Sequence, residues 1–241
     1  MEEFAKLFGE LEIEKQRQII NHFGEFVTDK RRELIDKVLG NRTKHITVVV
    51  EDIKKYHNAN AVVRSCECFG IQDVHVIERG GLFDVRRGIA KGSYKWVNVN
   101  RYNDKEAQNT QACLTQLKQK GYQLLMTSPE EGSTLISDVD ISKPIALMFG
   151  TEKDGISEMA KEQADALVKV PMYGFTESLN ISVSVAICLH NLVSRLHESE
   201  IDWRLKETEE LAIKLDWYWK VINKPEIHFA YMLKQLNQLE I

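Results

Sequence analysis

Three segments of this 241-residue chain place polar residues where a buried strand or a turn passes into a helix. The first, residues 57–66, sets Asn58 and, six positions later, Arg64 among small and apolar residues. The second, residues 146–157, follows an apolar run with GTEKDGIS, and the third, residues 170–186, carries PMYG and then SLN. Loops at the carboxyl ends of strands in open α/β sheets bind ligands, and glycines there let backbone amides approach a ligand closely. The three segments are therefore the candidate site.

Each segment also has a purely structural explanation. Asn58 is a natural N-cap, Arg64 suits an exposed helix face, and Ser178 or Asn180 suits the N-cap of a later helix. GTEKDGIS is not a phosphate loop, because it lacks the GxxxxGK[ST] spacing and carries acids where phosphate would lie. The chain has no GxGxxG motif either, so a generic nucleotide-binding α/β protein is the weaker alternative.

The three segments belong to a pattern of alternating strands and helices. Apolar runs rich in β-branched residues predict strands, and apolar residues at helical spacing predict helices. The predicted strands are 46–50, 74–77, 96–99, 122–126, 144–149 and 167–170, and the predicted helices between them are 58–69, 104–120, 157–165 and 180–197. This alternation predicts βαβ units and a parallel, doubly wound sheet.

Helical segments flank this predicted core. Residues 1–44 are expected to form a helical N-terminal extension, residues 45–200 the main domain, and residues 201–241 a C-terminal helical extension. Gly40 is a plausible stop for the N-terminal helices, and Pro225 suits the start of the last helix. The chain shows no internal repeat or flexible linker.

Composition excludes several classes of protein. With 43% hydrophobic and 28% charged residues, 13 Gly and 4 Pro, the chain is neither collagen-like nor disordered. No apolar run approaches the ~18 residues that cross a membrane, and the acidic start is not a signal peptide. Four cysteines without CxxC spacing predict neither a disulfide framework nor a metal site. We therefore expect a cytoplasmic protein with no membrane partner.

The net charge of −4 hides a local excess of positive charge. Residues 79–105 hold seven Lys and Arg against two Asp, interleaved with Phe, Tyr and Trp. Such a basic, aromatic stretch on an acidic protein is typical of a surface that contacts phosphates, although a solvated loop is the plain alternative. The candidate phosphate contacts are Arg86, Arg87, Lys91 and Lys95, together with the separate cluster Lys30, Arg31 and Arg32.

In their order and spacing, the three polar segments resemble the signature motifs of the SpoU/TrmH family of RNA ribose 2′-O-methyltransferases, which belong to the SPOUT class. The matching patterns are NxxxxxR followed by SCxxFG, then FGxExxGxS, then PMxGxxxSLNxSVxxAI, within residues 45–197. The sequence KGSYKWV at 91–97 and the short N-terminal extension resemble the tRNA-specific TrmH branch, since ribosomal-RNA relatives carry a larger extra RNA-binding domain. Glu177 departs from the pattern only at a variable position.

The resemblance implies a C-terminal trefoil knot, which no compositional argument predicts, and a homodimer. It also implies S-adenosyl-L-methionine as methyl donor, with S-adenosyl-L-homocysteine as product. By motif position, the cofactor contacts fall on Thr127, Gly150, Val170 and Leu179. The residues expected to support catalysis are Arg64 and Asn180, with Asn58, Glu152 and Ser178 assisting. The implied substrate is tRNA, methylated on the ribose of guanosine-18 in the D-loop.

The family assignment gives Arg64 the role of activating the ribose 2′-hydroxyl. A guanidinium ordinarily stays protonated and cannot accept a proton. Our hypothesis is that Arg64 holds the adjoining phosphate and stabilises the developing alkoxide, while the proton leaves through phosphate, water or Glu152. The alternatives are a 2′-O-methyltransferase acting on ribosomal RNA and a non-catalytic SPOUT-fold RNA-binding protein.

Overall fold

The computed structural model describes residues 2–53, 55–78, 92–104, 108–151 and 155–238. Contacts within the chain define two compact units. One comprises residues 43–203, and the other joins the two chain ends, residues 1–42 and 204–241. The sequence predicts two separate extensions at the chain ends, whereas in the structure these ends pack together as one helical unit.

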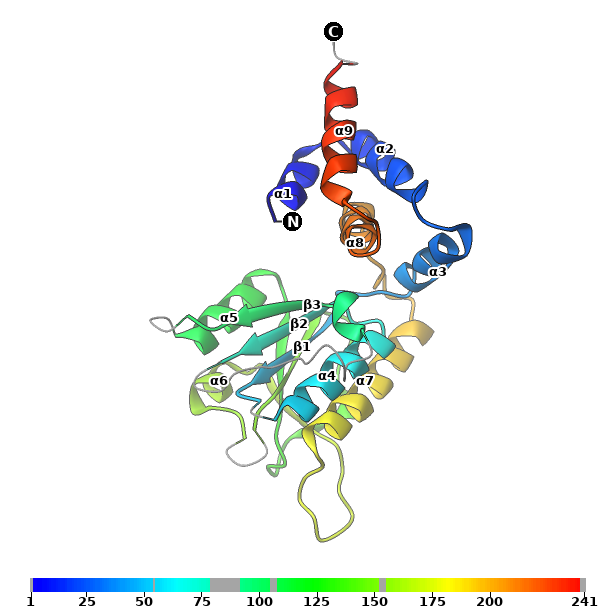
Figure 1. Cartoon of the computed structure of the whole chain (residues 1–241). Coiled ribbons are helices and arrows are strands. Elements are labelled where there is room, and N and C mark those ends of the chain that lie inside the picture. Colours follow the sequence, from blue (N-terminus) through cyan, green and yellow to red (C-terminus); the bar gives the residue numbers. More distant parts are fainter. Residues whose placement is uncertain (1, 54, 79–91, 105–107, 152–154, 239–241) are drawn as a thin grey trace. The chain divides into compact units, whose positions relative to one another are not determined.

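The unit of residues 43–203 is built around one parallel sheet (Figure 1). Its strands lie in the order β3-β2-β1-β6-β4-β7-β5, and each neighbouring pair runs parallel. The strands are β1 (Ile46–Glu51), β2 (Asp73–Ile77), β3 (Asn98–Tyr102), β4 (Gln123–Thr127), β5 (Thr134–Leu135), β6 (Ile145–Phe149) and β7 (Ala166–Lys169). The predicted parallel α/β sheet is confirmed.

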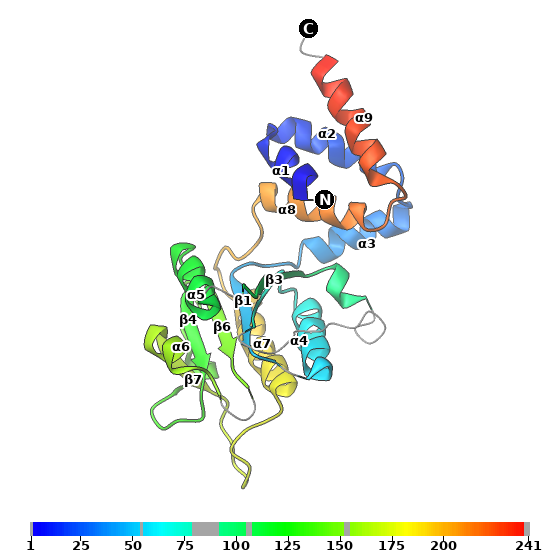
Figure 2. The same ribbon diagram turned by 60° about the vertical axis from the view of Figure 1, so that its left-hand side comes forward.

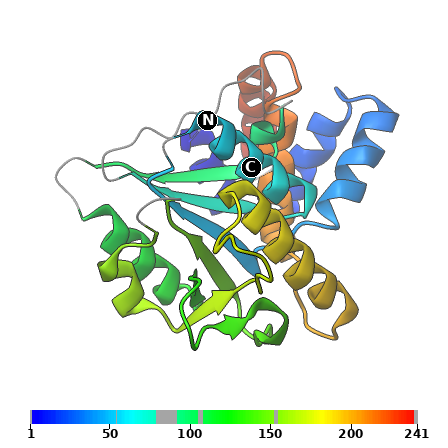
Figure 3. The same cartoon turned by 90° about the horizontal axis from the view of Figure 1, so that it is seen from below.

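Two pairs of helices cover the two faces of this sheet (Figure 3). Helices α4 (Tyr56–Cys68) and α7 (Ile181–Glu198) pack against each other on one face, and α5 (Asn109–Gln119) and α6 (Glu158–Gln163) on the other. In β1 every residue is buried: Val48 and Val50 join the core under α4 and α7, and Val49 joins the core under α5 and α6. This double burial explains why β1 is a β-branched run instead of an alternating one.

Helix α4 begins earlier than the sequence predicted. Asn58 was expected to be its N-cap, but the helix starts at Tyr56 with Lys55 as N-cap. The Ala59 N–H donates to the Lys55 carbonyl oxygen at 3.1 Å, so Asn58 lies inside the first turn of the helix. The Asn58 side chain is consequently not a cap, and it contacts Asn180 at the start of α7 instead.

Two further boundaries differ from the prediction. The strand expected at 96–99 is β3 at Asn98–Tyr102, because Gly92, at φ +83°, leads into a short 3-10 turn, η1 (Ser93–Lys95). The helix expected from Asp104 begins at Asn109, whose side-chain amide donates to the Asp104 carbonyl oxygen at 3.0 Å. This side-chain bond favours a turn over a helix at Asp104.

A second 3-10 turn, η2 (Ile136–Asp138), follows β5, the short edge strand that the sequence did not predict.

The helical unit consists of α1 (Glu2–Glu10), α2 (Ile13–Gly24), α3 (Asp29–Leu39), α8 (Glu207–Trp219) and α9 (Pro225–Gln238). Helix α8 contacts α1, α2 and α3, and α9 contacts α2. The core of the helical unit is apolar and aromatic, with Phe8, Phe23 and Phe229 each almost fully buried. The predicted helical content of both chain ends is confirmed.

Candidate active site at the carboxyl edge of the sheet

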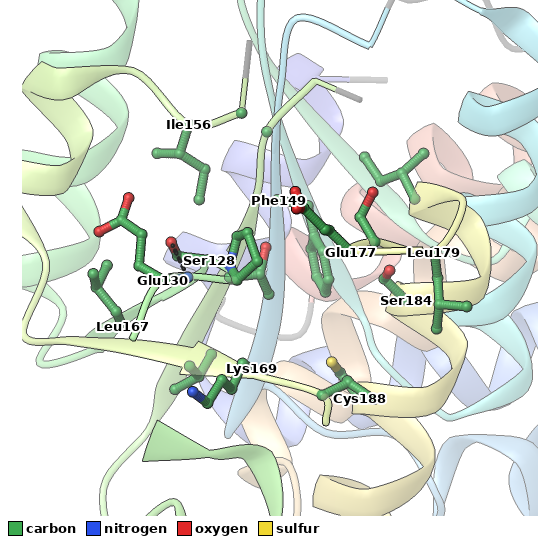
Figure 4. A pocket seen from close by; sticks show the side chains of 18 of the residues that line it. Ser128, Glu130, Phe149, Ile156, Leu167, Lys169, Glu177, Leu179, Ser184 and Cys188 are labelled. Carbon is green, nitrogen blue, oxygen red and sulfur yellow. Dashed lines mark hydrogen bonds between the residues drawn. The ribbon is translucent and has the colours of Figure 1, made fainter. Parts of the chain in front are cut away.

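The loops that follow three neighbouring strands surround a cavity. Strands β6, β4 and β7 are adjacent in the sheet, so their carboxyl ends lie at one edge. The loops after them, around Gly150, Ser128 and Val170, line a cavity of about 440 Å³ together with the start of α7 (Figure 4). This is the position at which open α/β sheets bind ligands.

All four residues that the sequence assigns to the cofactor line this cavity. Thr127 ends β4, Gly150 follows β6, Val170 follows β7, and Leu179 precedes α7. The Thr127 hydroxyl donates to the Met148 carbonyl oxygen at 3.0 Å, which ties the ends of β4 and β6 together. Residues from four separate segments of the chain thus line one cavity.

The lining of the cavity is about equally polar and apolar. The apolar lining comprises Phe149, Ile156, Leu167, Val168, Val170, Met172, Leu179 and Ile181. Glycines at 150 and 155 give access to backbone groups. The apolar side chains suit the faces of a ring system, and main-chain and polar side-chain groups suit its edge and the polar parts of a small molecule.

The turn from Gly150 to Ser157 approaches the cavity with no space for a side chain at its start. A Cβ atom on Gly150 would lie 2.1 Å from the carbonyl carbon and oxygen of Gly155. The Thr151 N–H donates to the Gly155 carbonyl oxygen at 3.0 Å, and the Gly155 N–H donates back to the Thr151 carbonyl oxygen at 3.1 Å. The turn is therefore closed at its base, and glycine is required at 150 by close packing of backbone on backbone.

Charged side chains lie at one side of the cavity. Lys161 Nζ lies 2.9 Å from Glu130 Oε1 and 3.3 Å from Glu158 Oε1. The hydrogen bond to Lys161 lowers the pKa of the Glu130 carboxyl, and the two carboxylates raise the pKa of Lys161. Lys161 and Glu130 therefore remain charged near neutral pH, and the pair links the loop after β4 to α6 at this side of the cavity.

Cys188 of α7 also lines the cavity (Figure 4). Burial raises the pKa of its thiol to about 12, so the group is protonated at neutral pH. The thiolate is the nucleophilic form of cysteine. Cys188 is therefore an apolar wall of the site and not a nucleophile.

The second group of predicted site residues meets where α4 faces the start of α7. Asn180 is the N-cap of α7: its Oδ1 accepts from the Ser182 N–H at 3.0 Å, as the capping prediction required. The Asn180 Nδ2 donates to Asn58 Oδ1 at 3.2 Å, and Ser178 lines the cavity. Asn58 and Asn180 are thus brought together at one end of the site although they are 122 positions apart in sequence.

Arg64 lies on the exposed surface of α4 and is not among the residues that line the cavity. Among the described residues its guanidinium has neither a hydrogen-bond nor an ion-pair partner. Its charge is consequently open to a ligand that reaches the surface from solvent.

Other predicted contacts fall elsewhere. Glu152, Arg86, Arg87 and Lys91 lie outside the described residues. Lys95 is exposed at the end of η1, and Lys30 and Arg31 are exposed on α3. Arg32 is partly engaged within the helical unit, since its Nη2 donates to Asp29 Oδ1 at 2.6 Å.

Several residues of the site were not predicted from the sequence. Glu130, Lys161 and Cys188 gave no local signal, because their common cavity exists only once three loops meet. Glu51 did give one, since a carboxylate ends an otherwise uncharged run of buried strand residues. Among the described residues, no cluster of three His, Cys, Asp or Glu side chains suits a metal ion. The same part of the chain contains no helix long and apolar enough to cross a membrane.

Comparison with known proteins agrees with this geometry. The tRNA (guanosine(18)-2′-O)-methyltransferase of Borreliella burgdorferi is 39% identical over 203 residues, covering 84% of this chain and 91% of that protein. The protein of the same name from Thermus thermophilus is 35% identical over 195 residues, covering 80% of this chain and 98% of its own length.

Solved structures share the fold. The A. aeolicus TrmH/SpoU tRNA modifying enzyme superposes with a TM-score of 0.72 at 30% identity, covering 81% of this chain and 98% of that one. The SpoU methyltransferase AviRb from Streptomyces viridochromogenes, solved in complex with AdoMet, has a TM-score of 0.56 at 20% identity, covering 68% of this chain and 62% of that one. The profile described as the SpoU rRNA Methylase family matches residues 45–190, the span that contains both the cavity and the three motifs. The chain belongs to the SpoU methylase family.

Proposed function

We propose that this protein is a tRNA 2′-O-methyltransferase that transfers a methyl group from S-adenosyl-L-methionine to the ribose 2′-hydroxyl of guanosine-18 in the D-loop. The observation that carries the proposal is the cavity at the carboxyl edge, lined by Thr127, Gly150, Val170 and Leu179. Relatives that cover 80% or more of the chain bear the name of this activity. The protein would act in the cytoplasm, where its tRNA substrate is found.

The cavity suits S-adenosyl-L-methionine. Its volume of about 440 Å³ lies in the usual range for small-molecule sites. Apolar side chains from β7 and the loop after it suit the adenine, and Gly150 and Thr151 also line the cavity. When bound, the cofactor supplies an electrophilic methyl group and becomes S-adenosyl-L-homocysteine.

The residues of the chain have to bring the ribose hydroxyl to this site and assist loss of its proton. The hydroxyl is a weak nucleophile at neutral pH, so the proton leaves in or before the transition state. Arg64 carries an exposed guanidinium that suits a phosphate next to the ribose, and its charge stabilises a developing alkoxide. Asn180, held by Asn58 and Ser182, fixes the start of α7 and therefore Ser178 beside the cavity. Phosphate, water or Glu152 takes the proton.

The direct test is transfer of label from S-adenosyl-L-methionine to unmodified tRNA transcripts, with the product mapped as a nuclease-resistant 2′-O-methyl dinucleotide. We expect one methyl group at guanosine-18. Methyl transfer to ribosomal RNA and not to tRNA would support the proposed reaction but contradict tRNA as its substrate. Cofactor binding without transfer to either RNA would favour the non-catalytic, RNA-binding alternative.

The basic residues are proposed to hold the tRNA backbone. Replacing Arg86, Arg87 and Lys91 together with alanine should weaken tRNA binding and reduce the slope of log K against log salt by about 0.7–0.9 per lost phosphate contact. Binding would be measured by filter retention over a range of salt concentrations, with cofactor affinity expected to stay at the wild-type value.

A matched control is the triple alanine variant of Lys118, Lys120 and Lys143. These exposed lysines lie near the amino ends of β4 and β6, at the edge opposite the cavity. The control removes the same charge but should keep the wild-type salt slope. Equal slopes in both variants would remove residues 86–91 from the tRNA contact. The cluster Lys30, Arg31 and Arg32 is proposed as a second contact and is tested in the same way.

The protein is proposed to be a homodimer. Helix α7 exposes Val183 and Ile187, at 43% and 38%, and the loop before it exposes Tyr173 and Phe175 almost completely. That loop extends away from the sheet (Figure 1 and Figure 2). Exposed apolar residues gathered on one element favour a protein contact. The trefoil knot stays a prediction from the resemblance.

Light scattering should therefore give a mass of twice 27.8 kDa at micromolar concentration. Replacing Val183 and Ile187 with glutamate should shift the protein to the monomer, because a buried carboxylate would be unpaired. Ile227→Glu, at a residue 58% exposed on α9, is the control and should stay dimeric. A wild-type monomer would overturn the proposal.

A further inference from the structure

Glu51 is a buried carboxylate that the chemistry proposed above does not use. It is the last residue of β1 and has no exposed surface. Its register partner on β2 is Ile77, and the next residue, Asp52, has φ +56° and donates its N–H to the Ile77 carbonyl oxygen at 2.9 Å. The chain therefore leaves the sheet directly after Glu51, whose carboxylate stays at the carboxyl edge.

The carboxylate binds the end of the cavity turn with both oxygens. Its Oε2 accepts from the Ser157 N–H at 3.0 Å, and its Oε1 accepts from the Ser157 hydroxyl at 2.9 Å. The hydroxyl of Thr110, in the first turn of α5, donates to the same Oε1 at 2.7 Å. One carboxylate thus joins the end of β1, α5 and the residue at which the turn enters α6.

Ser157, which Glu51 holds, directly follows two residues of the cavity wall in the chain. Gly155 and Ile156, which precede Ser157, both line the cavity, and Ile156 is 5% exposed. At the other end of the turn, Thr151 is bound to Gly155 by two backbone hydrogen bonds. Fixing Ser157 therefore fixes Ile156 and Gly155, and through Gly155 the position of Thr151.

Burying a carboxylate is costly unless hydrogen bonds replace its hydration. An apolar residue at the end of β1 would pack into the same core at lower cost, as Val49 does two positions earlier. Hydrogen bonds to a charged acceptor are about twice as strong as neutral ones and directional. A carboxylate at 51 therefore provides what an apolar side chain does not: hydrogen bonds that fix the position of Ser157.

We propose that Glu51 is a positioning residue for the cofactor: by holding Ser157, its carboxylate keeps Gly155 and Ile156, and through Gly155 the backbone of Thr151, in the position that receives S-adenosyl-L-methionine. This inference rests on the proposed function of the cavity. Glu51 does not itself line the cavity, so its effect is transmitted through the backbone of Gly155 and Ile156.

The test compares Glu51→Gln with Thr110→Val in the full-length protein. Glu51→Gln keeps the size of the side chain but replaces the charged acceptor with a neutral amide, so the bonds to Ser157 and Thr110 become weaker neutral ones. Thr110→Val removes only the bond from α5 to the same carboxylate and leaves both bonds to Ser157 in place. Dissociation constants for S-adenosyl-L-methionine and S-adenosyl-L-homocysteine are measured by calorimetry, and backbone exchange at residues 155–160 by hydrogen–deuterium exchange without cofactor.

Glu51→Gln should raise the cofactor Kd about tenfold, the loss expected when several hydrogen bonds to a charged acceptor become neutral ones. It should also accelerate exchange at residues 155–160. In steady state, the KM for S-adenosyl-L-methionine should rise by a similar factor, while the KM for tRNA and kcat at saturating cofactor stay within about twofold of wild type. Thr110→Val should lower Tm but leave cofactor Kd and exchange at 155–160 unchanged. Glu51→Asp, which keeps the charge on a shorter side chain, should fall between wild type and Glu51→Gln.

Wild-type cofactor affinity in Glu51→Gln would overturn the inference, as would an equal loss of affinity in Thr110→Val, which would mean that Glu51 supports only overall stability. If Glu51→Gln does not fold, Ser157→Ala replaces it, because it removes the hydroxyl bond from the side of the turn. Failure of the wild-type protein to bind the cofactor would refute the proposed function instead. The exchange measurement would in that case still decide whether Glu51 holds the turn.

Discussion

Replacing Arg64 with alanine should reduce methyl transfer to tRNA by about 10²–10³-fold, the usual loss when one group that stabilises developing negative charge is removed. Arg64 is exposed on α4, and its guanidinium has no hydrogen-bond or ion-pair partner within the described residues. Its removal should therefore leave the fold and its Tm intact. The measurement is single-turnover transfer from labelled S-adenosyl-L-methionine, with cofactor Kd expected at the wild-type value because Arg64 does not line the cavity.

Arg64→Lys separates charge from geometry. Lysine keeps the positive charge but loses the planar fork that binds phosphate through two hydrogen bonds. We expect a rate between those of wild type and Arg64→Ala. Lys118→Ala, which removes an exposed charge near the end of α5, is the control and should transfer at the wild-type rate. Near-full turnover in Arg64→Lys would contradict the bidentate contact, and near-full turnover in Arg64→Ala would remove Arg64 from the reaction.

Replacing Gly150 with alanine should abolish cofactor binding at concentrations that saturate the wild-type protein. The new Cβ would lie 2.1 Å from the Gly155 carbonyl group and 2.4 Å from the Ile156 nitrogen, and all these atoms are backbone. A flexible side chain could move away, but here the turn itself has to shift, and it forms one wall of the cavity. Overpacking of this kind also costs about 1–3 kcal/mol of stability. Calorimetry with S-adenosyl-L-methionine and a thermal melt measure the two effects.

Gly9→Ala is the matched control for this substitution. Gly9 is exposed in α1, and a Cβ added there meets no atom within 4 Å. The control makes the same chemical change at a residue that does not line the cavity, and should keep cofactor affinity without lowering Tm. A Gly150→Ala variant that binds the cofactor as well as Gly9→Ala does would show that the turn is not part of the cofactor site.

Much of the site was predictable from the sequence, because its residues lie in local patterns with a local cause. The β-branched run at 46–50 forms a doubly buried strand, and Asn180 caps α7, as expected from their residue types. The four cofactor positions were implied by the family resemblance, and they agree with the strand assignment, since three follow strand ends and one precedes a helix. The spacing of the motifs indicated the SpoU/TrmH family, and with it the reaction expected at the carboxyl edge of the sheet.

Local patterns failed where a distant group determines the backbone. Asn58 has the residue type of an N-cap, yet α4 starts at Tyr56 and the Asn58 side chain instead accepts a hydrogen bond from Asn180. The helix expected at Asp104 starts at Asn109, whose amide also donates to the Glu78 carbonyl oxygen at 3.0 Å. In both cases hydrogen bonds outside the local pattern outweigh a small local propensity.

The sequence alone determined most of the helices and strands and their parallel arrangement, because hydrophobic periodicity and turn chemistry act over a few residues; it missed the edge strand β5 and the starts of α4, β3 and α5. Only the tertiary structure decided which of those residues meet. Glu51 and Ser157 are 106 positions apart, and Glu130 and Lys161 are 31 apart. Such pairs depend on the order of strands in the sheet, which brings the ends of β1, β6, β4 and β7 together regardless of their separation along the chain.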